Sequence, residues 1–228
     1  KDSGYVDGKR CMCFSKKAID LIYKDSNLKN ITTDENFDTF SFSWYNNTDI
    51  DPATGLTPYN NMQKVLKVCH DFVDNFDTNF SNLLFIGQTG VGKTFLSNCI
   101  ARALMDSCHS IIYLTAGEFF DSFKSDDFKE FGSSKFDTSF FVECDLLIID
   151  DLGTEKASDY NFSNLFNTIN ERLLRRKSII ISSNLEMPDI ETRYSQRIFS
   201  RLVSAYSILR LFGDDIRCMK KLSPTKRS

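Results

Sequence analysis

The chain has 228 residues, an ordinary globular composition and a formal net charge of -3. This length allows one large hydrophobic core, and the acidic balance argues against a general nucleic-acid coat, so any DNA site has to be local. No apolar run approaches the roughly 18 residues of a membrane span, and residues 1–10 lack the apolar core of a signal peptide. The seven scattered cysteines, an odd number, indicate buried thiols in a reducing, cytoplasmic compartment.

Two cysteines, Cys11 and Cys13, lie close together after a turn-rich stretch. They can be read as half of a zinc site whose other ligands precede Lys1, because the chain does not begin with Met and we expect it to be a fragment. A structural zinc needs about four ligands, and no other cysteine or histidine lies nearby in the sequence. Two ordinary thiols are therefore the favoured interpretation within these residues. Residues 16–23 have the apolar spacing of a short helix.

Four aromatic residues follow in an extended, partly alternating pattern: Phe37, Phe40, Phe42 and Trp44. They can pack against a nucleotide base, although an aromatic group of this kind more often belongs to a hydrophobic core. Residues 51–58 predict a loop, because two prolines and a glycine interrupt them. Apolar residues then recur at intervals of three and four over residues 62–76, which predicts an amphipathic helix.

The stretch GQTGVGKT at residues 87–94 fits the phosphate-binding loop pattern G-x-x-x-x-G-K-[ST]. An apolar strand is predicted before it, over residues 82–86, and a helix with one apolar face after it, which is the order that this loop requires. Its glycines let backbone N–H groups converge on phosphate oxygens at a helix N-terminus. Lys93 is expected to reach the β- and γ-phosphates of ATP, and Thr94 to bind Mg²⁺. The predicted nucleotide-binding residues are Gly87, Gln88, Thr89, Gly90, Val91, Gly92, Lys93, Thr94 and Phe95.

Strands and helices alternate through the rest of the chain. Buried strands are predicted over residues 110–114, 145–149, 178–182 and 208–212, and helices over residues 115–123, 162–173 and 188–203. Thr115 and Glu118 form the capping-box pattern at the start of the first of these helices. Residues 125–139 are charged and irregular and are expected to form a mobile connection. The alternation predicts an α/β fold with three layers around a central parallel sheet.

An acidic pair, Asp150 and Asp151, follows the predicted strand at residues 145–149. Four apolar residues followed by an acid form the Walker B pattern, so Asp150 is expected to hold Mg²⁺ directly or through water. Asp151 is placed to orient or deprotonate the attacking water, and Glu155 is a second candidate for that role. The structural alternative is an acidic turn after a strand, and the phosphate loop upstream favours the catalytic interpretation.

Polar and basic residues after the acidic pair complete the set of candidates. Asn184 follows a strand end and can bond the γ-phosphate or the attacking water, or simply cap a turn. Arg197 and Arg201 share a helix face and can act on the nucleotide of a neighbouring subunit, the alternative being an ordinary charged surface. Arg217 follows the last predicted strand and can reach the phosphates within its own chain.

Five motifs in this order, GQTGVGKT, LLIIDDLG, ISSN, SQRIFSRL and FGDDIR, resemble those of the AAA+ ATPases. More narrowly, the chain resembles the DnaC/DnaI helicase-loader group together with the IstB transposition helpers. The opening stretch KDSGYVDGKRCMCF is similar to the end of the zinc-binding region that precedes the ATPase in Gram-positive members. The resemblance implies a zinc-type end and linker over residues 1–50, an AAA+ ATPase domain over residues 51–219 without a helical lid domain, and a basic tail over residues 220–228.

The resemblance also assigns roles to single residues. It implies that Lys93 and Thr94 bind phosphate and Mg²⁺ and that Asp150 is the Walker B acid. It implies the sensor 1 role for Asn184, the arginine finger for Arg201 with Arg197 as the fallback, and a sensor-2-like role for Arg217. Many AAA+ proteins have Glu where Asp151 stands, so the identity of the base and the rate of hydrolysis stay open.

The function expected from the resemblance is that of the ATP-binding and slowly hydrolysing domain of a replicative helicase loader, assembling as a homo-oligomer on single-stranded DNA. The helicase itself is expected to bind through the missing amino-terminal part, and no membrane partner is expected. Ser158 and Tyr160 fall where the resemblance places DNA contacts, and Phe123 with Lys124 is a second candidate segment. The alternatives are an IstB-type transposition helper, a nucleotide-binding scaffold with negligible turnover and a P-loop small-molecule kinase. A kinase is disfavoured because no acceptor-binding arginine lid follows the loop.

Overall fold

The computed structural model describes residues 5–6, 9–10, 34–124 and 138–222. The predictions for Cys11, Cys13 and the helix at residues 16–23 lie outside the described residues. So do most of the predicted connection, residues 125–137, and the end of the tail, residues 223–228. Near the start of the chain, β1 (Tyr5–Val6) and β2 (Lys9–Arg10) pair as a short antiparallel ladder.

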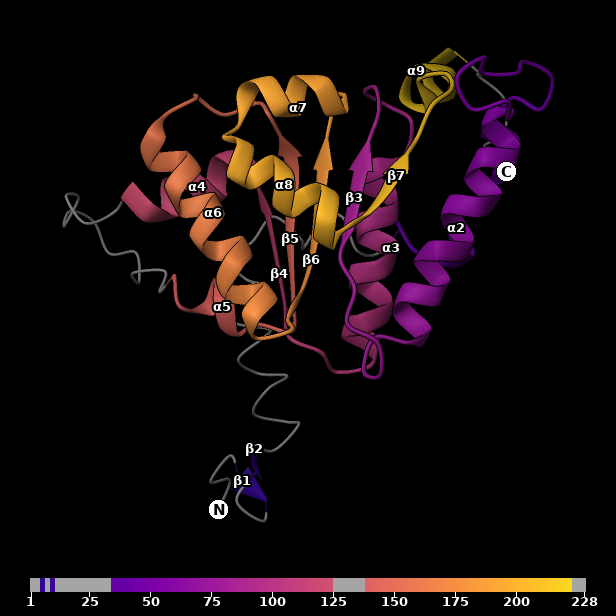
Figure 1. The fold of residues 1–228 in the computed structure, drawn as a ribbon. Coiled ribbons are helices and arrows are strands. Elements are labelled where there is room, and N and C mark those ends of the chain that lie inside the picture. The colour runs from indigo at the N-terminus through magenta and orange to yellow at the C-terminus, as the bar shows by residue number, and fades with distance from the viewer. Residues whose placement is uncertain (1–4, 7–8, 11–33, 125–137, 223–228) are drawn as a thin grey trace.

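A sheet of five parallel strands forms the centre of the molecule, in the order β4-β5-β6-β3-β7 (Figure 1). The strands are short apolar runs, as expected for a parallel sheet that is covered on both faces. Their bounds are β3 (Leu83–Ile86), β4 (Ile111–Thr115), β5 (Leu146–Leu152), β6 (Ser178–Ser183) and β7 (Ser207–Arg210).

Helices cover both faces of this sheet, which confirms the predicted three layers (Figure 1). Side chains of β3 alternate between the faces: Leu83 and Phe85 join one hydrophobic core, and Leu84 and Ile86 join the other. The first core is completed by α2 (Pro58–Asp74) and α3 (Lys93–Asp106). The second is completed by α4 (Ala116–Lys124), α5 (Phe140–Glu143), α6 (Asp159–Leu174), α7 (Met187–Arg193) and α8 (Gln196–Ala205). The last helix is α9 (Ile216–Leu222), and no helix among the described residues is long and apolar enough to cross a membrane.

The aromatic stretch predicted to be extended instead forms two 3-10 turns, η2 (Phe37–Thr39) and η3 (Phe42–Trp44). Asn36 and Ser41 cap these turns with their side chains, accepting hydrogen bonds from the backbone N–H groups of Thr39 and Ser43. Such local side-chain bonds compete with extended structure. Residues 34–46, called the strap below, pack against the first core.

The single helix predicted over residues 188–203 is two helices, α7 and α8, and that prediction was wrong. The chain is extended at Tyr194 and Ser195, and the Ser195 hydroxyl then caps α8 by accepting from the N–H of Ile198 at 3.5 Å. Tyr194 is buried and its hydroxyl donates to Glu155 at 2.6 Å. The break thus coincides with a local cap at Ser195 and with a long-range contact of Tyr194.

Several strand and helix ends also differ from the predictions by a few residues. The strand β5 includes Asp150 and Asp151 and continues one residue further, to Leu152. Residues 220–222 were assigned to the basic tail, but they form the last part of α9. The capping box at Thr115 is confirmed, because the Glu118 carboxylate accepts from the Thr115 N–H at 2.8 Å and the Thr115 hydroxyl accepts from the Glu118 N–H at 3.3 Å.

Candidate functional site

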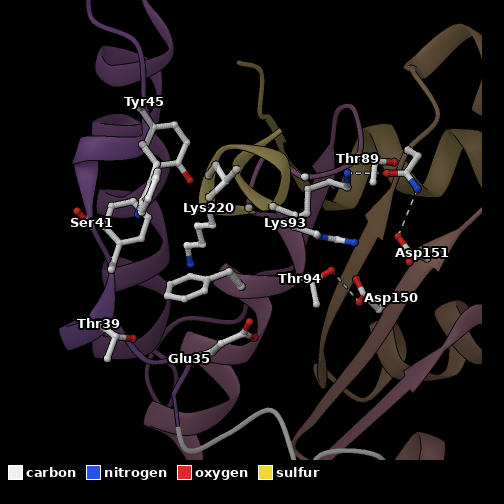
Figure 2. Close-up of a pocket in the computed structure, with 18 residues that line it drawn as sticks. Glu35, Thr39, Ser41, Tyr45, Thr89, Lys93, Thr94, Asp150, Asp151 and Lys220 are labelled. Atoms are coloured by element: carbon white, nitrogen blue, oxygen red, sulfur yellow. Dashed lines mark hydrogen bonds between the residues drawn. The ribbon is translucent and has the colours of Figure 1, made fainter. Parts of the chain in front are cut away.

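A cavity of about 420 Å³ opens at the carboxyl ends of β3, β5 and β6. This is the edge at which open parallel sheets bind ligands, and the volume lies within the roughly 300–1,000 Å³ of small-molecule sites. Figure 2 shows the side chains that face it. Ten residues predicted from the sequence line this cavity: Thr89, Gly90, Gly92, Lys93, Thr94, Phe95, Asp150, Asp151, Asn184 and Arg217.

Lys93 lies at the first position of α3 with only 5% of its surface exposed. Its ammonium group donates to the carbonyl oxygens of Gly87 and Gln88 and to Oδ1 of Asn184, each at 2.7 Å. Burial lowers the pKa of Lys93, and the carboxylate of Asp151 opposes that shift. The geometry gives a charged donor at the inner end of the loop, which is where the phosphate-loop pattern requires one.

Gly90 is the point where the loop and the carboxyl-terminal helix meet. Its φ is +82°, and a Cβ atom added there would lie 2.2 Å from the carboxylate carbon of Asp215. Asp215 begins α9 by accepting from the backbone N–H groups of Arg217 at 2.8 Å and Cys218 at 3.2 Å. The N–H of Ile216 donates to the Gly90 carbonyl at 3.0 Å. Any side chain at Gly90 would therefore displace the Asp215 carboxylate that caps α9.

Three hydroxyl groups surround the carboxylate of Asp150, which is 5% exposed. Thr94 donates to Oδ2 at 3.0 Å and Tyr113 donates to the same oxygen at 2.9 Å. Ser182 donates to Oδ1. Thr94 and Asp150 together offer the hard oxygen ligands that Mg²⁺ takes, while Tyr113 and Ser182 hold the carboxylate in place. Neither Tyr113 nor Ser182 was predicted as a site residue, and the only signal for them was a polar side chain within an otherwise apolar strand.

Asp151 has a positive φ of 57°, which is unusual for a residue with a side chain. Its N–H donates to the Ser182 hydroxyl at 2.9 Å, and its Oδ1 accepts from Nδ2 of Asn184 at 3.4 Å. Burial and the neighbouring Asp150 raise the pKa of Asp151, while Lys93 opposes the shift. The side chain of Asp151 lies in the cavity (Figure 2), where it is bonded to Asn184.

Glu155, the second candidate for the base, does not line the cavity. Its buried carboxylate accepts from the N–H of Gly153 at 2.8 Å and from the hydroxyl of Tyr194 at 2.6 Å. The guanidinium of Arg193 lies 3.5 Å away. With these partners Glu155 connects the loop after β5 to the junction of α7 and α8, and it makes structural contacts outside the cavity.

Arg197 and Arg201 are both exposed on α8, and neither lines the cavity. Arg217 does line it, from the start of α9. Its positive charge adds to the lowering of the Lys93 pKa and opposes the rise in the pKa of Asp151. Of the three candidate arginines, only Arg217 is therefore among the described residues that line this cavity.

Residues outside the predicted motifs complete the cavity wall. Glu35 and Tyr45 come from the strap and Lys220 comes from α9 (Figure 2). Trp44 of the strap lines the cavity as well. The Lys220 ammonium lies 5.6 Å from the centre of the Trp44 ring, within the range of a cation–π contact. The aromatic pattern at residues 37–44 was a signal for this wall, whereas neither Glu35 nor Lys220 carried one.

A parallel sheet with a phosphate loop, a Walker B acid and a polar residue on the adjacent strand end defines a P-loop nucleotide-binding protein of the AAA+ type. The chain belongs to the family of IstB-like ATP-binding proteins, whose family model matches residues 57–223. The resemblance drawn from the motifs is confirmed at this level.

The chain is also similar to curated proteins and to solved structures. The replicative helicase loader DnaC of Escherichia coli K12 is 24% identical over 151 residues, covering 66% of this chain and 61% of DnaC, so the chain spans less than two thirds of that relative. A crystal structure of the DnaC helicase loader matches with a TM-score of 0.63 at 21% identity, over 79% of this chain and 98% of that one. The replication initiator DnaA bound to AMPPCP and single-stranded DNA matches with a TM-score of 0.57 at 20% identity, over 70% of this chain and 50% of DnaA.

Proposed function

We propose that this chain is the ATP-binding and ATP-hydrolysing part of a replicative helicase loader that assembles on single-stranded DNA. The observation that carries the proposal is the convergence of Lys93, Asp150, Asp151 and Asn184 around one cavity. The family supports nucleotide binding, and the similarity to DnaC supports the loader role.

The triphosphate is expected to lie along the loop, with its β- and γ-phosphates against the Lys93 ammonium. Thr94 and Asp150 would hold Mg²⁺, because their oxygens are already 3.0 Å apart and directed at one another. When bound, the ion neutralises charge on the phosphate oxygens. The hydroxyls of Tyr113 and Ser182 keep the Asp150 carboxylate in the orientation that this role needs.

Hydrolysis requires a group that orients the attacking water and accepts its proton. Asp151 is the best placed, since it faces the cavity and has a raised pKa. Asn184 lies between Lys93 and Asp151, within hydrogen-bond distance of both. It can therefore contact the γ-phosphate and the water together, and Arg217 can add positive charge from α9.

The exposed arginines on α8 suit a shared site between subunits. Arg201 is proposed to reach the γ-phosphate of a neighbouring copy, where an arginine can stabilise the charge of the transition state. Arg197, one turn earlier on the same face, is the alternative finger. ATP would then favour assembly of a homo-oligomer, and hydrolysis would release it.

DNA is proposed to contact the surface that joins α4 to α6. The Tyr160 hydroxyl donates to the carbonyl oxygen of Phe123 at 2.7 Å, so the two segments considered for DNA are neighbours. The Tyr160 ring is 53% exposed, which leaves a face for a stacked base. Ser158 instead uses its hydroxyl to cap α6, accepting from the N–H of Asn161 at 3.1 Å, and Lys124 is the last residue of α4.

The second candidate is an IstB-type transposition helper, favoured by the description of the matching family model. Both functions use the same ATPase, and they differ in the partner protein. Co-purification of the full-length protein with its cellular partner distinguishes them: recovery of a ring helicase supports the loader, and recovery of a transposase supports the helper.

Turnover of ATP with and without single-stranded DNA tests the ATPase itself, with Lys93→Ala as the inactive control. Phosphate release that depends on Lys93 and responds to DNA supports the proposal. Transfer of the phosphate to a small-molecule acceptor instead of water would show a kinase and overturn it. If the chain bound ATP without hydrolysing it, it would be a nucleotide-binding scaffold and not an ATPase.

A further inference from the structure

The carbonyl oxygens of the phosphate loop accept hydrogen bonds from several parts of the chain. A loop that turns its N–H groups toward a phosphate turns its carbonyl oxygens the other way, and each buried carbonyl then needs a donor. Lys93 supplies the carbonyls of Gly87 and Gln88, each at 2.7 Å. The N–H of Ile216 supplies the carbonyl of Gly90 at 3.0 Å. Motif residues and α9 thus account for three of the loop's carbonyl groups.

The next carbonyl along the loop, that of Val91, is bonded by the strap. The hydroxyl of Tyr45 donates to it at 3.3 Å. Tyr45 is 9% exposed and lies across the cavity from Asp151 (Figure 2). This hydrogen bond connects the phosphate loop to a segment that precedes the whole sheet in the sequence.

Gly92 shows how closely Tyr45 approaches the loop. A Cβ atom added at Gly92 would lie 2.7 Å from the Tyr45 hydroxyl oxygen, and the φ of Gly92 is +106°. Two features therefore favour glycine at this position: its positive φ, and the space that Tyr45 occupies where a Cβ atom would lie. The tyrosine is packed against the peptide between Val91 and Gly92, immediately before Lys93.

The strap that carries Tyr45 is itself fixed by aromatic contacts. The ring of Phe37 lies 4.3 Å from that of His70 on α2, and the ring of Phe42 lies 5.2 Å from that of Tyr59 on the same helix. The rings of Phe40 and Tyr45 are stacked 5.8 Å apart with an interplanar angle of 18°. These contacts hold the tyrosine in one orientation, which is what a positioning group requires.

The protonation state of Tyr45 suits a permanent donor. Burial, with a smaller contribution from Cys99, raises the pKa of the Tyr45 hydroxyl well above its usual value. The hydroxyl therefore keeps its proton at every pH at which the protein would be assayed.

We propose that Tyr45 is a positioning residue for nucleotide binding: its hydroxyl fixes the Val91–Gly92 peptide and so holds the loop in the shape that receives the triphosphate. Tyr45 lies outside the motifs that identify the site, and its role is to set the affinity of the loop rather than to take part in hydrolysis. This inference rests on the nucleotide site proposed above and adds the strap to it.

Tyr45→Phe tests the proposal, because it removes the hydroxyl and keeps the ring. Calorimetry with a non-hydrolysable ATP analogue should show binding weakened about three- to ten-fold, as expected for one lost hydrogen bond. The rise in unfolding temperature caused by the analogue should shrink accordingly. The rate of hydrolysis at saturating ATP should stay within about two-fold, since the hydroxyl bonds the loop backbone and the shift belongs in KM.

Tyr59→Phe is the matched control, because Tyr59 belongs to the same aromatic group and its side chain has no hydrogen bond among the described residues. Its affinity for the analogue should equal that of the wild type. Wild-type affinity in Tyr45→Phe, or an equal loss in both variants, would overturn the inference while leaving the nucleotide site intact. A wild-type chain that does not bind the analogue would overturn the proposed function itself.

Discussion

Lys93 and Asn184 are joined by a hydrogen bond of 2.7 Å from the ammonium group to Oδ1. They lie far apart in the sequence, but β3 and β6 are neighbours, with Ile86 opposite Ser183. The residues that follow these two strands therefore emerge side by side. The bond connects the group expected to hold the phosphates with the residue expected to sense them, so a change at either position should be felt at the other.

Lys93→Ala should abolish tight ATP binding while leaving the fold intact. A charge-assisted hydrogen bond contributes on the order of 1.5–3 kcal/mol, so the dissociation constant should rise at least ten-fold. Calorimetry with ATP measures it, and circular dichroism checks the fold. Lys67→Ala, an exposed lysine on α2, is the control and should bind as the wild type does. Unchanged affinity in Lys93→Ala would remove the phosphate-loop assignment.

Asp151→Asn and Glu155→Gln should separate the proposed base from the structural acid. Loss of a general base lowers turnover by about 10²–10⁴-fold where hydrolysis is fast, and by less in a slow enzyme. Asp151→Asn should therefore bind ATP but lose hydrolysis. Glu155→Gln should keep most of its turnover and unfold at a lower temperature, because it weakens the contacts with Arg193 and Tyr194.

The pH profile gives an independent check on Asp151. Its raised pKa means that the carboxyl takes up a proton at a higher pH than an ordinary aspartate does. A base must be deprotonated to act, so kcat should fall as the pH is lowered through this raised pKa. The acidic limb should be absent from the residual activity of Asp151→Asn, and its persistence there would assign the limb to another group.

Arg201→Ala should bind ATP normally as a monomer and lose turnover, because the side chain is exposed on α8 and is proposed to act on a neighbouring copy. The measurement is ATP hydrolysis in mixtures of Arg201→Ala with Lys93→Ala protein. Partial recovery of activity indicates a shared site, since each variant supplies what the other lacks. No recovery at any ratio, with Arg197→Ala recovering instead, would move the finger to Arg197.

Tyr160→Ala should weaken binding to single-stranded DNA, because a stacked base contributes about 1–3 kcal/mol. Fluorescence anisotropy with a labelled oligonucleotide, at a saturating concentration of an ATP analogue, measures the loss. Tyr160→Phe keeps the ring but loses the hydrogen bond to Phe123. It therefore separates the contribution of ring stacking from that of the bond between α6 and α4. If a folded Tyr160→Ala protein bound single-stranded DNA as tightly as the wild type, this part of α6 would not be a DNA contact.

Asp145→Asn should reduce the acid sensitivity of the fold. Burial opposes ionisation of Asp145, but the Lys177 ammonium at 2.7 Å and hydrogen bonds from Ser110 outweigh it and lower its pKa. A lowered folded-state pKa stabilises the fold above the unfolded value of about 3.9, and this stabilisation is lost as the pH falls through the folded value. Urea unfolding from pH 7 downward should show a smaller pH dependence in Asp145→Asn than in the control Asp74→Asn, an exposed residue.

The sequence by itself determined the order of the five sheet strands along the chain, most of the helices between them and the position of the phosphate loop. It also placed Asp150 and Asn184 at strand ends next to that loop. These are local patterns: an apolar run, a glycine spacing and an acid after a strand depend on neighbours within a few residues. Because all strands of the sheet are parallel, their carboxyl ends had to meet at one edge, and the polar residues that follow them had to converge.

Only the tertiary structure decided which other residues reach the site. Tyr45 precedes the sheet in the sequence and Lys220 follows it, yet both line the cavity, while Glu155, close to the Walker B acid in sequence, turns away to bond Tyr194. That same contact lies at the break between α7 and α8. Such contacts join residues far apart along the chain, and the packing of strap, sheet and helices selects them. No local spacing encodes them, because the backbone between the partners can follow many paths and burial fixes only one.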